Sequence, residues 1–274
     1  MAARLATVVL VLFTSFTSAV DYEIVKADRH DPGATATFNK TILPDEGGPS
    51  NWRGHANGFE AVFDNASPYF RVFPPHGGSP CDKRVKTSVT AKANGCKWAT
   101  NGGPFNMNTG ACDCGVAISN GHVYGTGGWG HTQFGVTGDG AWVIGTINET
   151  VATALNVTNS VNGFSWLVRN GKVAIGKDTY VAPRTAIGVK KDGRLISLEV
   201  DGCEPQVGCL WKLGKTEYDM AQLLVTRGAL HAINLDGGGS SSVVEDGKVI
   251  DHPTDKDRWL LRDERAVTTI TCVL

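Results

Sequence analysis

Three features that identify particular classes of protein are absent from this sequence. Lys and Arg number 26 against 27 Asp and Glu, so the chain lacks the excess positive charge with which proteins bind nucleic acid. After residue 20 it lacks any apolar run of the roughly 20 residues that span a bilayer. It also lacks internal repeats and low-complexity tracts. We therefore expect no nucleic-acid partner, no membrane anchor in this chain and no repeat architecture.

What is present suits one globular domain. The sequence has 274 residues, of which 41% are hydrophobic and 19% charged. A chain of this length buries roughly three-quarters of the surface that its unfolded form exposes. Glycine is abundant, with 34 residues, and it occurs where the backbone turns tightly or approaches a ligand closely. We therefore expect a substantial core with many turns.

The N-terminus has the composition of a secretory signal peptide. Arg4 supplies positive charge, residues 5–16 form a mostly apolar stretch shorter than a membrane span, and small residues follow it. We predict a signal peptide over 1–19 and a mature domain over 20–274. Within that domain, 20–75 is either a propeptide, an N-terminal extension or the first strands of the fold. The product is expected in the lumen of the secretory pathway (the Golgi) or outside the cell.

Sequons and cysteines agree with export. Glycosylation acceptors of the N-x-S/T type lie on the surfaces of secreted proteins, and they begin here at Asn39, Asn65, Asn148 and Asn156. The 7 cysteines would normally pair in an exported chain. Cys203 and Cys209 are close enough in sequence to clip a loop together.

Paired turn residues recur from residue 115 onward. Asn-Gly and Asp-Gly favour the positive φ of tight hairpin turns. Turns of this kind lie between apolar segments at Asn120-Gly121, Gly138-Asp139-Gly140, Asn170-Gly171, Asp192-Gly193 and Asp246-Gly247. We therefore predict an α+β fold dominated by sheet, with mostly antiparallel hairpins and a few helices.

One helix is signalled at both ends. Thr216 and Asp219 resemble a capping box, the apolar residues that follow lie on one face, and Gly228 is placed to end the helix. Shorter helices are expected at 85–92 and 150–155, and strands at 58–63 and 69–73 within an otherwise irregular N-terminal part.

Three glycine-rich segments interrupt the hairpin pattern: Asn101–Asn106, Arg184–Gly188 and Asn234–Ser240. Adjacent glycines at a strand end expose backbone N–H groups that can bind a phosphate, although such a run is more often a plain turn. No Lys follows the glycines, so the run is not a P-loop. No group of His, Asp or Glu has the sequence spacing of metal ligands. We therefore expect no catalytic metal and no cofactor.

Five motifs, in order along the chain, resemble the phosphodiester glycosidase family. They are Asn101–Gly103, Gln133–Gly135, Trp166–Gly171, Arg184–Gly188 and Ile233–Ser240. The resemblance implies a hydrolase that removes α-linked N-acetylglucosamine from N-acetylglucosamine-1-phospho-6-mannose. Its partners would be phosphorylated high-mannose glycans of glycoproteins, on which it would expose mannose 6-phosphate for lysosomal targeting. The sequence leaves self-association into a homo-oligomer open.

The motifs supply candidate residues for this chemistry. Arg184 is expected to bind the phosphate with its guanidinium, unless it forms a surface ion pair. Asp236 and Asp201 are the candidate carboxylates for stabilising positive charge on the sugar, unless they are ordinary Asp-Gly turn residues. Which of them acts as nucleophile or base stays open. Substrate-binding roles are expected for Asn101, Gly102, Gly103, Phe105 (otherwise a core residue), Gln133, Thr185, Asn234, Gly237, Gly238, Gly239 and Ser240.

The resemblance also implies two disulfides, Cys81–Cys112 and Cys96–Cys272. With Cys203 paired to Cys209, Cys114 is left over. The animal members of the family continue into a membrane span, whereas this sequence ends at Leu274, so no anchor is carried over from the resemblance.

Two other functions stay open. The first is cleavage of a different sugar 1-phosphodiester. The second is non-catalytic carbohydrate binding, which predicts the loss of polar groups from the motif segments. Arg184, Asn234, Asp236 and Ser240 are all present, which favours an enzyme.

Overall fold

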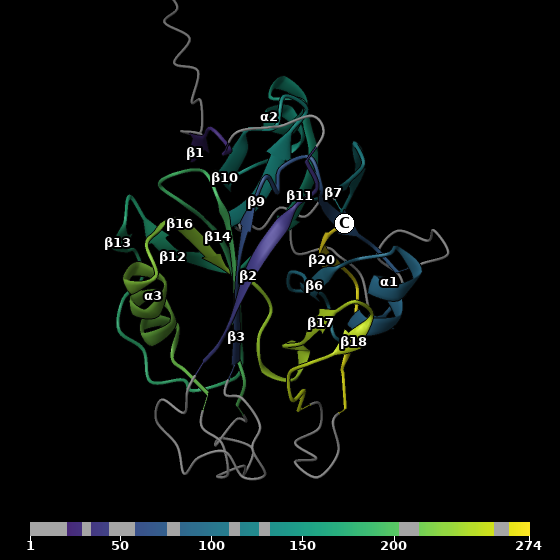
Figure 1. The fold of residues 1–274 in the computed structure, drawn as a ribbon, viewed down its shortest axis with the longest axis vertical. Coiled ribbons are helices and arrows are strands. Elements are labelled where there is room, and N and C mark those ends of the chain that lie inside the picture. Colours follow the sequence, from purple (N-terminus) through teal and green to yellow (C-terminus); the bar gives the residue numbers. More distant parts are fainter. Residues whose placement is uncertain are drawn as a thin grey trace, which may run out of the picture.

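The computed structural model shows a protein built mainly of antiparallel sheets (Figure 1). The residues that it describes are 21–28, 34–43, 58–75, 83–109, 116–125, 132–202, 214–254 and 263–274. The predicted signal peptide, the predicted pairs Cys81–Cys112 and Cys203–Cys209, and Cys114 lie outside these residues.

Three larger sheets and one small one carry the described strands. The six-stranded sheet A runs in the order β1 (Tyr22–Val25), β10 (Trp142–Thr146), β9 (Thr132–Thr137), β11 (Val157–Asn162), β7 (Ala117–Ser119) and β8 (His122–Tyr124). The seven-stranded sheet B runs in the order β13 (Lys172–Val173), β12 (Ser165–Arg169), β16 (Ala229–Asn234), β14 (Arg184–Lys190), β15 (Leu195–Val200), β3 (Gly58–Asp64) and β2 (Thr37–Ile42). The five-stranded sheet C runs in the order β18 (Lys248–Val249), β17 (Val243–Glu245), β6 (Trp98–Asn101), β20 (Ile270–Val273) and β4 (Phe70–Phe73), and β19 (Ala266–Val267) pairs with β5 (Val85–Lys86).

The predicted hairpins are confirmed. β7–β8, β9–β10, β12–β13, β14–β15 and β17–β18 are antiparallel pairs joined at the expected turns. Asn120, Asn170 and Asp246 have φ values of 49°, 53° and 48°, and each is followed by a glycine that also has positive φ. Two successive residues with positive φ define the hairpin turn that matches the twist of paired strands. The sheet-dominated α+β class follows from these turns and is confirmed.

The three predicted helices are present, with shifted ends. α3 (Glu217–Thr226) begins after Thr216, whose hydroxyl accepts a hydrogen bond from Asp219 N at 3.0 Å. α1 (Thr87–Ala93) starts two residues later than predicted, because residues 85–86 form β5. α2 (Glu149–Ala154) is capped by Asn148. Among the described residues, no helix has the length and apolarity to cross a membrane.

The N-terminal part contains more structure than predicted. β1 and β2 were expected to be irregular, but β1 pairs with β10 and β2 with β3. Both are edge strands with many polar, partly exposed residues, so no alternation of apolar residues marks them. β3 lies between β15 and β2 in the interior of sheet B. If a propeptide is removed, we therefore expect the cut to fall before Gly58, because a later cut would take out an interior strand.

Aromatic side chains from all three sheets meet in one core. Phe63 of sheet B, Phe70 and Trp98 of sheet C, and Phe134 and Trp142 of sheet A are all at most 2% exposed. The ring centroids lie 5.3–6.1 Å apart in the pairs Phe63–Trp98, Phe70–Phe134, Phe70–Trp142 and Phe134–Trp142. Such pairs add to the free energy gained from burying the rings. The core therefore fixes the sheets against one another.

A second core lies between sheet B and α3, which Figure 1 shows beside β12 and β13. Met220 and Leu224 of the helix are fully buried against Leu167 and Leu198 of the sheet. The apolar face predicted for this helix is the face that it buries.

His231 of β16 gives the fold an expected sensitivity to acid. The ring is 3% exposed, and its Nδ1 atom has no hydrogen-bond partner among the described residues. Burial lowers the pKa of His231 below 6.5, so the unfolded chain binds a proton more readily than the folded chain does. The contribution of the neutral His231 ring to the free energy of unfolding is fully present above about pH 6.5. It is lost as the pH falls below that value.

We predict that the change in the free energy of unfolding in urea from pH 7 to pH 5 is more unfavourable for the wild type than for His231→Leu. The exposed His122 supplies the control, since His122→Leu should keep the wild-type slope. A His231→Leu slope equal to that of the wild type would contradict the prediction.

Candidate functional site

The three glycine-rich segments meet around one buried side chain. Asn101, at the end of β6, is 0% exposed. Its Oδ1 accepts hydrogen bonds from Thr185 Oγ1 at 2.8 Å and from Ser242 N at 3.2 Å, and its Nδ2 donates to Asp236 O at 2.7 Å. Asp236 N also donates to Gly102 O at 3.1 Å. The amide of Asn101 therefore joins sheets B and C inside the protein.

Close backbone approach explains the first pair of glycines. A Cβ atom on Gly103 would lie 2.0 Å from Asn162 O, and one on Gly102 would lie 2.8 Å from Thr269 O. Any side chain at either position would collide with backbone. These glycines therefore let the chain that leaves β6 pass between β11 and the segment before β20.

The glycine loop after Asp236 binds mainly to the protein itself. Gly237 N donates to Asp236 Oδ1 at 3.1 Å, Gly238 N to Pro183 O at 2.9 Å, and Ser240 N to Gly237 O at 3.1 Å. Residues Gly238–Ser240 form a 3₁₀ turn, which Gly238 enters with a φ of 58°. In this conformation these three N–H groups are bonded within the protein, and the phosphate-binding role of Gly237–Ser240 stays a prediction.

Arg184 is buried, and it is held by the segment that leads into α3. It is 6% exposed. Its Nε donates to Lys215 O at 3.0 Å, Nη1 to Glu217 Oε1 at 3.3 Å, and Nη2 to Tyr180 O at 2.7 Å. The alternative of a surface ion pair is therefore wrong: the pair with Glu217 is an internal one. Each terminal nitrogen carries a second N–H group beyond these bonds.

Glu217 is the site residue that the sequence analysis missed. Besides Arg184, its carboxylate accepts hydrogen bonds from Asn234 Nδ2 at 3.2 Å and from Ser165 Oγ at 3.1 Å. A Cβ on Gly237 would lie 3.7 Å from Arg184 Cδ, so the glycine loop packs on this arginine. The capping pattern at Thr216 predicted where α3 begins, but it carried no information on which residue Glu217 faces.

Asp201 belongs to a different group of side chains. It lies with Glu199 and Asp251, and one oxygen from each carboxylate falls within 4.8 Å of the others. Asp201 Oδ1 accepts a hydrogen bond from His252 N at 2.9 Å. Burial, reinforced by the negative charge of Asp201, raises the pKa of Asp251 well above its usual range. All-oxygen ligand sets suit hard cations, so this group could hold a metal ion.

Two predicted substrate-binding residues are internal. Phe105 is 7% exposed and packs in the small core beneath α1, which supports its reading as a core residue. Gln133 is 2% exposed. Its Nε2 donates to Ile147 O at 2.5 Å, and its Oε1 accepts from Ser160 Oγ at 2.9 Å. Neither side chain is open to a ligand in this conformation.

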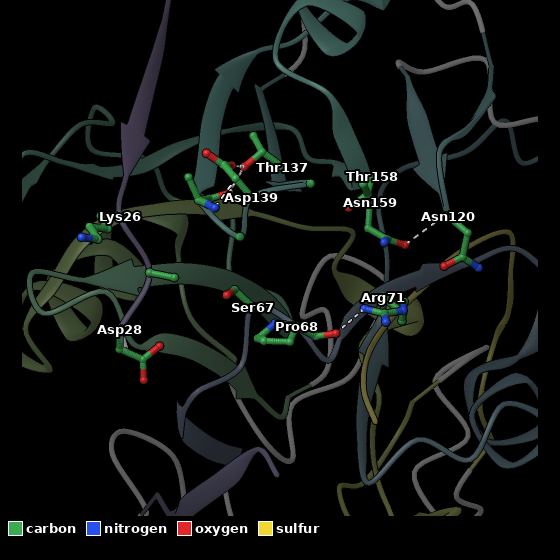
Figure 2. A pocket seen from close by; sticks show the side chains of 14 residues that line it. Lys26, Asp28, Ser67, Pro68, Arg71, Asn120, Thr137, Asp139, Thr158 and Asn159 are labelled. Atoms are coloured by element: carbon green, nitrogen blue, oxygen red, sulfur yellow. Dashed lines mark hydrogen bonds between the residues drawn. The ribbon is translucent and has the colours of Figure 1, made fainter. Parts of the chain in front are cut away.

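The protein also has a cavity of about 660 Å³, and Figure 2 shows the side chains that line it. Lys26, Asp28, Arg71, Asp139 and Asn159 are among the residues that line it. The cavity opens at one end of β9 and β11, beside Thr137 and Asn159, whereas Gln133 and Asn162 lie toward the other end of the same strands. Its lining contains none of the predicted site residues.

The sequons differ in accessibility. Asn39, Asn148 and Asn156 are exposed, but Asn65 is 8% exposed, and its Nδ2 donates to Ala34 O at 2.8 Å. The folded chain offers no accessible amide at Asn65, which argues against a glycan there.

One predicted disulfide falls within the described residues and is confirmed. Cys96 and Cys272 are bonded, with Cα atoms 5.6 Å apart and a sequence separation of 176. The bond links the segment just before β6 to β20, and these two strands are neighbours in sheet C.

The sequence is similar to a known protein family and to individual proteins. The pattern of a family described as phosphodiester glycosidase matches residues 94–274. The N-acetylglucosamine-1-phosphodiester alpha-N-acetylglucosaminidase of Bos taurus is 33% identical over 230 residues, which cover 74% of this chain and 42% of the bovine protein. This chain therefore spans less than half the length of that relative. A prophage-derived uncharacterised protein of Bacillus subtilis is 30% identical over 214 residues, covering 72% of this chain and 30% of the bacterial protein.

A solved structure shows the same fold. The catalytic domain of zebrafish N-acetylglucosamine-1-phosphodiester alpha-N-acetylglucosaminidase, auto-inhibited by its pro-peptide, is 28% identical, with a TM-score of 0.78. The similarity covers 93% of this chain and 88% of the zebrafish chain. Since the family pattern spans most of the sequence and the motif segments meet in one place, the chain belongs to the phosphodiester glycosidase family.

Proposed function

We propose that this chain is a hydrolase that cleaves α-linked N-acetylglucosamine from N-acetylglucosamine-1-phospho-6-mannose, exposing mannose 6-phosphate on glycoproteins. Membership of the phosphodiester glycosidase family supports the reaction class. The observation that carries the proposal is the convergence of the three motif segments on Asn101, with Arg184 packed against Gly237 of the adjacent loop.

Arg184 is the proposed phosphate ligand. Glu217 and two backbone carbonyls hold its guanidinium in one orientation, and each terminal nitrogen keeps an N–H group for a further acceptor. A cation fixed in a partly buried place interacts more strongly with an anion than one in water does. Glu217 is therefore a positioning residue in this scheme.

Asp236 is the proposed carboxylate beside the sugar. It is partly exposed, next to the loop that packs on Arg184. In the reaction, the bond between sugar C1 and the phosphate oxygen breaks, and its electron pair leaves with the phosphate. Positive charge develops on the sugar ring, where a carboxylate stabilises it, and water supplies the hydroxyl group at C1. The phosphomonoester is a good leaving group, so no strong general acid is required.

The proposed compartment is the secretory pathway lumen (the Golgi) or the cell exterior. The Cys96–Cys272 disulfide supports it, because structural disulfides persist in oxidising compartments. The proposed partners are the phosphorylated high-mannose glycans of glycoproteins.

The test is release of free sugar from matched phosphodiesters by the purified chain. We expect kcat/KM for N-acetylglucosamine-α-1-phospho-6-mannoside to exceed that for the glucose analogue by at least about tenfold, which is ~1.4 kcal/mol. The second candidate is a different sugar 1-phosphodiester, because a relative also occurs in a bacterium, which has no lysosomes; faster cleavage of the glucose analogue would support it. Saturable binding without release of sugar from either compound would indicate a carbohydrate-binding protein.

A further inference from the structure

Three buried carboxylates come together near the candidate site, where Glu199 pairs across the strands with Thr185. Glu199 is 1% exposed, Asp201 3% and Asp251 1%. One oxygen of each lies within 4.8 Å of the other two. Glu199 and Asp201 are two residues apart at the end of β15, so their side chains leave the strand on the same face. Asp251 reaches them from the segment that follows β18.

Asp251 provides a separate reason to expect a ligand. Neither of its carboxylate oxygens makes a hydrogen bond of ordinary geometry within the described part of the chain, although the side chain is almost fully buried. The backbone N–H groups of Val243 and of Asp251 itself lie near enough to favour the charge, but they are too poorly placed to replace the water that burial removes. A carboxylate buried in this way is unfavourable unless something further compensates its charge. The two other carboxylates at its side add to this cost, because like charges repel strongly where water is excluded.

We propose that Glu199, Asp201 and Asp251 bind a calcium ion. Carboxylate oxygens are the ligands that hard divalent cations prefer, whereas zinc and copper sites draw on His and Cys. Calcium binds its oxygen ligands at about 2.3–2.6 Å, so ligands on opposite sides of the ion lie about 4.6–5.2 Å apart. Oxygens within 4.8 Å of one another fit such a shell. Calcium also tolerates irregular geometry, whereas magnesium demands a near-ideal octahedron.

The ion would stabilise the strands that carry the candidate site. Glu199 pairs across the strands with Thr185, whose hydroxyl donates to Asn101. Asp251 follows the β17–β18 hairpin, and β17 pairs with β6, which ends at Asn101. A cation at this place ties sheet B to sheet C next to the residue that joins the motif segments. It needs no part in the chemistry, and the proposal does not depend on the substrate.

The test uses the whole mature chain, stripped with EDTA and then titrated with calcium chloride. We expect about one calcium per chain by elemental analysis after desalting, and a rise in Tm of at least ~4 °C in 1 mM calcium over EDTA. Wild-type protein that retains no calcium and shows no rise would overturn the proposal. An equal rise with the same concentration of magnesium would overturn the assignment to calcium.

The variant Asp251→Asn tests the ligands, because it keeps the shape of the side chain and removes its charge. We expect its calcium affinity to fall by at least about tenfold and its Tm to become insensitive to calcium. The exposed Glu149 supplies the control, since Glu149→Gln should respond to calcium as the wild type does. If Asp251→Asn is more stable than the wild type, and the wild type does not respond to calcium, the negative charge of the cluster is compensated by a shared proton instead of by an ion. The wild-type measurements decide the question even if Asp251→Asn fails to fold.

Discussion

Replacing Asp236 by Asn is expected to lower kcat for hydrolysis of the phosphodiester by about a thousandfold or more, which corresponds to ~4 kcal/mol of transition-state stabilisation. The amide is similar in shape to the carboxylate and can still accept the hydrogen bond from Gly237 N. The change therefore removes the negative charge that stabilises the developing positive charge on the sugar. Steady-state assays of sugar release measure it, and the KM should change much less than kcat.

Asp246→Asn is the matched control for this variant. Asp246 also precedes a glycine, but it occupies the β17–β18 turn with a φ of 48°, a conformation that Asn adopts equally well. We expect its kcat to stay within about twofold of the wild type. If Asp236→Asn is as active as the wild type, Asp236 does not supply the charge that stabilises the sugar.

Truncation of Asn101 to Ala should produce the largest loss of stability. It removes the acceptor of Thr185 Oγ1 and Ser242 N and the donor to Asp236 O at once. Each buried polar group left without a partner costs about 1–3 kcal/mol. We expect the free energy of unfolding to fall by at least about 3 kcal/mol, measured by urea denaturation followed by tryptophan fluorescence.

Thr185→Val provides the comparison, since it removes one hydrogen bond and keeps the shape of the side chain. Its expected cost is about 1 kcal/mol. An Asn101→Ala variant no less stable than Thr185→Val would show that Asn101 does not join the two sheets.

Local chemistry explains which parts of the fold could be predicted. The turns at Asn120, Asn170 and Asp246 could be predicted, because Asn-Gly and Asp-Gly pairs adopt positive φ readily. The start of α3 could be predicted from Thr216, because its hydroxyl accepts a hydrogen bond from a backbone N–H that has no partner within the helix. β2 carries no such sign: its sequence is polar, and it forms because the edge of β3 offers it hydrogen bonds.

The candidate site was predicted only in outline. The structure brings the three glycine segments together, but the close approach of Asn162 O is by itself enough to require a glycine at position 103. Glu217 binds Arg184 across 33 residues, and Asp251 reaches Asp201 across 50. Contacts between residues so far apart depend on the packing of the sheets, which spacing in the sequence does not reveal.

Hydrolysis in ¹⁸O-labelled water is the most direct test of the proposed reaction. The wild-type chain is incubated with N-acetylglucosamine-α-1-phospho-6-mannoside, and both products are analysed by mass spectrometry. Cleavage between sugar C1 and the phosphate oxygen places the label in N-acetylglucosamine and leaves mannose 6-phosphate unlabelled, which is the result we predict. Label in the phosphate of mannose 6-phosphate would show attack at phosphorus and would contradict the assignment of this chain as a glycosidase.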